Sequence, residues 1–172
     1  MTYEILLGGL LRAIGGIYAI GSLIVLWGTL AASLAESAQA AIEARSMPSS
    51  TVWRTRWLVG SALLLLTCGL ALALLLNMAA PLFVLSAAGQ ALYLAVLAPR
   101  YFDPAEQPDE AGRQSSRSAL LVFAVATALV IAAWSAGWLL DWRTIPPAIT
   151  ASAVAVVLFA LAYAVANLRA TK

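Results

Sequence analysis

The residues of this chain that could act on a substrate are few: Arg12, Tyr93, Asp141 and the four carboxylates between Pro99 and Arg117. An arginine and an aspartate near one membrane interface would suit chemistry on a lipid headgroup better than any other reaction. However, no two of these residues are held together by sequence spacing. We therefore expect that the protein is not an enzyme and has no catalytic residue.

Metal and redox chemistry have even less support in the sequence. The chain has no histidine and one cysteine, Cys68, which lies inside the apolar run "LLLLTCGLAL" and has no partner for an intrachain disulfide. The carboxylates of "PRYFDPAEQPDEAGRQSSR" do not follow the alternate spacing and central glycine of a calcium loop. We expect no metal ligand and no cofactor.

The composition is that of a membrane protein rather than of a soluble domain. Of the 172 residues, 63% are hydrophobic and only 10% are charged, and the mean hydropathy is +0.91. The net charge of +2 is too small to indicate nucleic acid as a partner. Membrane lipids are the expected surroundings.

Five stretches are long and apolar enough to cross a bilayer as helices, which needs about 20 residues each. We predict an all-α integral membrane protein, a five-helix transmembrane bundle that forms one multi-pass domain over residues 1–172. The segment 34–45 is expected to prolong the first helix beyond the membrane. The predicted spans are residues 5–33, 57–77, 81–98, 118–140 and 146–168.

The distribution of basic residues predicts the orientation, because Lys and Arg near span ends stay on the cytoplasmic side. The connection between the second and third spans has no basic residue, and the one between the fourth and fifth has only Arg143. We therefore expect the N-terminus outside and the C-terminus in the cytoplasm. An arginine-rich, alanine-rich composition suggests a bacterial source and hence the inner membrane. The basic residues on the predicted cytoplasmic side are Arg45, Arg54, Arg56, Arg100, Arg113, Arg117, Arg169 and Lys172.

The first apolar segment has two other interpretations. As a cleaved signal peptide it would use "SAQA" before Ala41, but its removal would place the three arginines of the third connection outside. We therefore treat the segment as retained. The second alternative is a bundle of four spans with a partly interfacial N-terminal helix.

Small residues form a stripe along one face of the first helix, at alternating steps of four and three residues. Because lipid removes the hydrophobic drive between helices, close backbone approach across small residues is what favours their association. This stripe is the expected helix-packing seam. Its members are Gly8, Arg12, Gly15, Ala19, Ser22, Leu26, Thr29 and Ser33.

Arg12 is the one charged member of this seam. A charge at the bilayer centre costs roughly 2.5 to 3.5 kcal/mol and requires a partner, for which Asp141 at the end of the fourth span is preferred over Glu4 on the same helix. The alternative is a snorkelling anchor at the outer interface. An ion pair between Arg12 and Asp141 is therefore one prediction, and an unpaired interfacial Arg12 is the other.

Two further patterns concern the later spans. Ser86, Gln90 and Tyr93 form a polar intramembrane stripe in the third span, which favours hydrogen bonds to a neighbouring helix over a polar path. Tryptophans recur every four residues at 134, 138 and 142, which is typical of an aromatic belt and less so of a cage for a cation.

The seam and the absence of a catalytic constellation favour a non-enzymatic subunit or assembly protein that packs through its helix faces. Its partner would be another membrane protein or a second copy of the chain. The alternative is a small channel or transporter for an uncharged or weakly polar solute. The absence of acidic residues within the spans argues against coupling to ions or protons.

Overall fold

The computed structural model describes residues 2–102 and 110–170 and contains five long helices, with no strand in the described part of the chain. The first three are α1 (Thr2–Ile42), α2 (Ser49–Ala73) and α3 (Ala79–Leu92), which continues into a π-helical segment η1 (Tyr93–Phe102). Then follow α4 (Glu110–Ser135), a 3₁₀ turn η2 (Trp142–Thr144) and α5 (Pro147–Ala170). Five helices, α3 and η1 together counting as one, are long and apolar enough to cross a membrane, which confirms the predicted helical membrane bundle.

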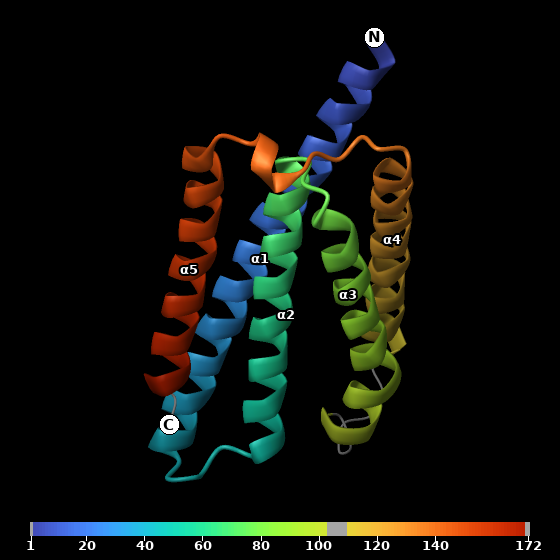
Figure 1. Ribbon diagram of the computed structural model, residues 1–172. Coiled ribbons are helices and arrows are strands. Elements are labelled where there is room, and N and C mark those ends of the chain that lie inside the picture. Colours follow the sequence, from blue (N-terminus) through green and yellow to red (C-terminus); the bar gives the residue numbers. More distant parts are fainter. Residues whose placement is uncertain (1, 103–109, 171–172) are drawn as a thin grey trace.

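The antiparallel pair of α1 and α2 lies in the middle of the bundle, with α3 and α4 on one side and α5 on the other (Figure 1). The buried side chains form two clusters, one on each side of this pair. The first joins α2 to α3 and α4 around Leu72, Phe83 and Val130. The second joins α1 and α2 to Ala160 and Ala164 of α5. Thus α1 and α2 form the wall that both clusters share.

Three aromatic rings join α1, α3 and α4 within the first cluster. Tyr18 meets Phe83 and Phe123 edge to face, with ring centroids 5.6 and 5.3 Å apart, and the two phenylalanines stack at 5.5 Å. These separations lie in the range where aromatic pairs attract beyond their buried area. The rings fix α3 and α4 against the half of the α1–α2 pair that contains the start of α1.

At one end of the bundle, called here the N-terminal end, the α2–α3 turn is tied to the connection between α4 and α5. Leu140 N donates to Leu75 O at 2.6 Å, and Asn77 N donates to Leu140 O at 2.9 Å. Leu75 adopts a positive φ of 55°, which lets the chain reverse within a few residues. The two connections therefore close this end as one unit.

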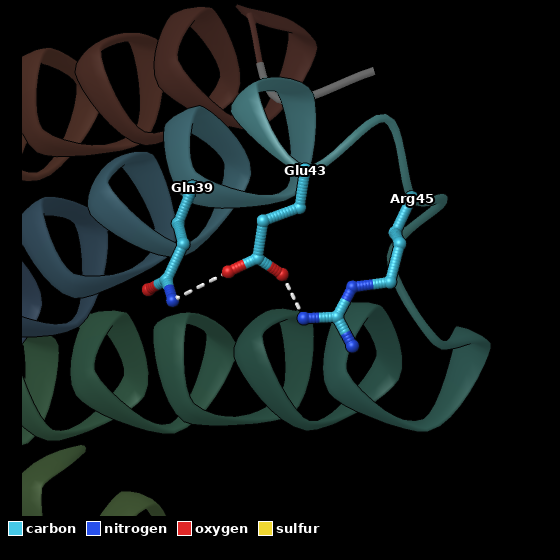
Figure 2. A network of polar contacts seen from close by, with 3 residues as sticks. All are labelled: Gln39, Glu43 and Arg45. Carbon is cyan, nitrogen blue, oxygen red and sulfur yellow. Dashed lines mark hydrogen bonds and ion pairs between the residues drawn. The ribbon is translucent and has the colours of Figure 1, made fainter.

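The opposite end carries the α1–α2 connection and the C-terminal end of α5, and it is called here the basic end. The prolonged first helix is confirmed as far as Ile42. There Gln39 donates to Glu43 at 3.1 Å, and Glu43 pairs with Arg45 of the connection (Figure 2). These contacts hold the connection against the end of α1.

Several helix ends differ from the expected spans, including the end of α2 at Ala73 instead of residue 77 and the start of α4 at Glu110 instead of residue 118. The second helix begins at Ser49, eight residues before the expected start, so Arg54 and Arg56 lie in its first two turns. The third continues through Pro99, where the wider π-helical register accommodates a residue that has no N–H to donate. The fourth ends at Ser135, five residues early, because the chain turns at Gly137 with φ +72°.

Because α4 ends at Ser135, the three tryptophans with a spacing of four residues do not lie on one helix. Trp134 lies in the last turn of α4, whereas Trp138 and Trp142 lie in the connection beyond it. The three indoles therefore do not share one helical face, although all are exposed at the N-terminal end. Arg143 lies over the Trp142 ring, 5.5 Å from its centroid.

Candidate functional site

The helices α1 and α2 cross in close contact at two glycines. A Cβ on Gly15 would lie 2.4 Å from the backbone nitrogen of Ala73 and 2.7 Å from the carbonyl oxygen of Gly69. A Cβ on Gly69 would lie 2.5 Å from the nitrogen of Ala19 and 2.7 Å from the oxygen of Gly15. Both glycines are therefore required for the two backbones to touch, as in close helix packing within lipid.

The structure brings most of the seam together at this crossing and leaves Arg12 outside it. Gly15, Ala19 and Ser22 are buried, and so are Leu26 and Ser33 further along α1. Gly8 and Thr29 are half-buried. Arg12 is exposed, and the buried residue at its level is Leu11.

The neighbouring residue Leu11 explains why Arg12 is exposed. Since Gly15 faces Ala73 and Ala19 faces Gly69 in antiparallel helices, Arg12 lies level with Leu76, in the turn that follows α2. At this level Leu11 occupies the buried face of α1 and packs in the first cluster with Leu72 and Leu75. The adjacent Arg12 side chain therefore lies outside the contact.

Asp141 does not pair with Arg12 in the structure. Its carboxylate oxygen Oδ1 accepts a hydrogen bond from the backbone nitrogen of Arg143 at 3.1 Å and caps the turn η2. Among the described residues no ion pair involves Arg12. The geometry therefore gives the expected ion pair no support, because a local turn already engages Asp141.

A cavity of about 420 Å³ opens between α1, α2, η1 and α4 in the half of the bundle nearer the basic end. Its polar lining is uncharged and comes from three helices: Ser22 of α1, Ser61 of α2, and Gln90 and Tyr93 of the third span. Apolar side chains such as Leu65 and Leu94 make up most of the remainder. This volume and this mixture are typical of pockets that take a small molecule.

The polar stripe of the third span is divided between the protein interior and this cavity. Ser86 is buried, while Gln90 and Tyr93 line the cavity. The Tyr93 ring stacks on Trp57 of α2, with centroids 6.5 Å apart and an angle of 14° between planes. Neither Trp57 nor Ser61 was expected at this site, although their spacing of four residues places both on one face of a helix.

The described residues contain no group of three or more His, Cys, Asp or Glu side chains that could hold a metal ion. Comparison with known families, characterised proteins and solved structures finds no match to this chain. The fold and the sites together define a helical membrane protein with a glycine-packed central helix pair and an uncharged internal cavity.

The glycine crossing predicts that alanine lowers the stability of the protein at position 15 but not at the adjacent position 16. Gly15→Ala places its Cβ against backbone atoms of α2, so the helices must separate, and overpacking of this kind typically costs about 2 kcal/mol. Gly16→Ala is the matched control, because no atom lies within 4 Å of a Cβ there. We expect a lower thermal unfolding midpoint in detergent for the first variant only. Equal midpoints would contradict the close contact.

Proposed function

We propose that the protein is a non-enzymatic membrane subunit that binds a second membrane protein through the N-terminal quarter of α1. The observation that supports this function is an apolar helix end that projects beyond the bundle (Figure 1). Ile5, Leu6 and Leu10 are 72%, 69% and 53% exposed there. No atom lies within 4 Å of a Cβ built on Gly9, so this part of α1 has an uncovered face.

The expected position of the membrane along α1 leaves these exposed apolar residues outside the hydrocarbon core. In the register of the helix pair, Arg56 of α2 lies level with about Ala32, so Arg12 and Arg56 are separated by about 30 Å along the axis. This distance equals the usual thickness of the hydrocarbon core. A membrane bounded by these two arginines leaves the apolar residues before Arg12 outside hydrocarbon.

No position of the bilayer keeps the Arg12 charge out of hydrocarbon and also covers the apolar residues before it. If the bilayer moves to cover Ile5 and Leu6, the Arg12 guanidinium enters hydrocarbon, at a cost of roughly 2.5 to 3.5 kcal/mol near the centre. If the bilayer stays, three large apolar side chains face water or headgroups. A partner helix on the face of α1 that carries Ile5, Gly9 and Arg12 can cover apolar surface and also offer an acceptor to Arg12, whereas Leu6 and Leu10 lie on the other side of the helix.

Charge favours a different chain over a second copy as the partner. In a symmetric pair through the face of α1 that carries Ile5 and Arg12, two Arg12 side chains would approach each other and repel. A partner helix with an acidic residue near its outer end would instead bind the guanidinium through charge-assisted hydrogen bonds. We therefore expect an apolar helix with one outer-end carboxylate.

Photocrosslinking in native membranes tests this function. A photoreactive amino acid at Ile5 or Gly9, exposed on the face of α1 that carries Arg12, should give one adduct of constant mass, whereas the same group at Phe159 should label lipid, because Phe159 is 75% exposed on α5. Arg12→Gln should reduce the protein adduct about tenfold, as expected for the loss of a charged hydrogen bond. Lipid adducts at all three positions would rule out the proposal, and a dimer-sized adduct would replace the partner with a second copy.

We further propose that the N-terminal end faces the outside of a bacterial inner membrane and the basic end the cytoplasm. This is supported by the described arginines that gather at the basic end, while the N-terminal end has two, Arg12 and Arg143. The described arginines at the basic end include Arg45, Arg54, Arg56, Arg100 and Arg169.

Accessibility of engineered thiols measures this orientation. Met78 is exposed in the α2–α3 turn and Ser46 is exposed in the α1–α2 connection, while the native Cys68 is buried. In intact cells a membrane-impermeant maleimide should react with the Met78→Cys variant and not with Ser46→Cys. Permeabilised cells should give reaction with both. The reverse pattern in intact cells would invert the orientation.

The cavity supports a second candidate function, the binding or passage of a small, weakly polar solute. Its polar groups are uncharged, and the Gln90 amide makes no hydrogen bond to another described residue, so its donors and acceptor are available to a solute.

Flux through proteoliposomes distinguishes this second function from the first. Solutes of graded size, beginning with glycerol, should enter faster than in protein-free vesicles, and Gln90→Leu should slow entry severalfold. Leu85→Met, at an exposed position of α3 away from the cavity, is the control. Vesicles with and without the protein would admit solutes equally if the cavity has no such role.

A further inference from the structure

A second cavity lies at the basic end, where the predicted membrane surface meets α1, α2 and α5. Its volume is about 630 Å³. One part of its wall is apolar, from Ala38, Ala41, Val52 and Leu168. The other part carries hydroxyl groups and the guanidinium groups of Arg45 and Arg56.

Ser33 is the feature of this cavity that calls for a ligand. It is only 4% exposed and lines the cavity, yet its hydroxyl makes no hydrogen bond to any described residue. Other serines of the same helix donate to its own backbone: Ser22 to Ala19 O and Ser37 to Leu34 O, each at 2.8 Å. The Ser33 hydroxyl therefore reaches the cavity with a donor free for a bound acceptor.

The charges around the cavity favour an anion. Arg56 lies over the Trp53 ring at 5.3 Å from its centroid and has no acidic partner among the described residues. Arg45 pairs with Glu43, which lines the adjoining surface together with Glu36 rather than this cavity (Figure 2). The cavity is therefore lined by the guanidinium of Arg56, which has no acidic partner among the described residues, by that of Arg45, which pairs with Glu43, and by the hydroxyl of Ser33.

The position of the cavity indicates which kind of anion fits. Arg56 marks the level where hydrocarbon ends, and Trp53 in the same turn is exposed, as is usual for indoles at the headgroup boundary. A ligand here meets cationic and hydroxyl groups on one side and an apolar wall on the other. That arrangement matches an amphiphile, and basic pockets between helices at this level suit anionic headgroups.

We infer that this cavity binds the phosphate ester of an anionic membrane phospholipid, with Arg56 and Ser33 as its donors and the apolar wall beside the upper acyl chain. Thr55 shares the lining, but its hydroxyl already donates to Thr51 O at 3.0 Å. Arg45 contributes by exchanging part of its contact with Glu43 for the phosphate. The site is independent of the partner proposed for the opposite end of α1.

Native mass spectrometry of the purified full chain, titrated with phosphatidylglycerol and with phosphatidylcholine, tests this site. The apparent Kd for phosphatidylglycerol should rise about tenfold in Arg56→Gln. Arg54→Gln is the matched control, because it removes the same charge from the same end of α2 but does not line the cavity. Ser33→Ala, which removes the hydroxyl without adding bulk, should also weaken binding.

Three outcomes would overturn the inference. Equal weakening by Arg54→Gln and Arg56→Gln would mean diffuse attraction by surface charge. Equal affinity for the anionic and the zwitterionic lipid would remove the role of net charge. Stoichiometric binding of glycerol 3-phosphate at the affinity of the lipid would identify a soluble phosphate ester as the ligand instead of the membrane. The thermal midpoint of each variant, measured without lipid, shows whether the fold is retained.

Discussion

The contact of Gly15 with Ala73 and of Gly69 with Ala19 is the constraint on which the rest of the bundle depends. Because the two backbones touch at these points, α1 and α2 have one register and no freedom to slide. That register determines which residues of α1 lie beside a neighbour and which project past the bundle. The two buried clusters, one toward α3 and α4 and one toward α5, both use this pair as a common wall.

The number of spans and the face of α1 that packs could be predicted because both are properties of a single helix. A run of about 20 apolar residues is visible in the sequence, and so is the angle that groups Gly15, Ala19 and Ser22. Which helix meets that face could not be predicted. Gly69 is one of several small residues in its span, and only the three-dimensional pairing selects it.

Arg12 and the tryptophans lie elsewhere than the sequence predicted, because their positions also depend on contacts and turns outside their own helices. Arg12 is exposed because Leu11 occupies the buried face of α1 at that level, and which of these two adjacent residues packs depends on the neighbouring helices. The end of α4 lies at Ser135 although the sequence remains apolar to Leu140, because a backbone turn at Gly137 intervenes. Hydropathy measures transfer into lipid and contains no information about local backbone reversal. The cavity between the helices takes its polar lining from three of them, so it has no signature within any one helix.

The placement of the tightest contact between the first two helices has a consequence for how the protein is made. A chain enters the membrane in order from its N-terminus, so the hairpin of α1 and α2 is complete before later helices leave the ribosome. The helices α3 and α5 then pack on this pair, and α4 packs mainly on α3. The last, α5, crosses to the free side of that pair by way of the connection over the N-terminal end. The order of synthesis and the order of packing therefore agree, and no helix has to be inserted between two that have already met.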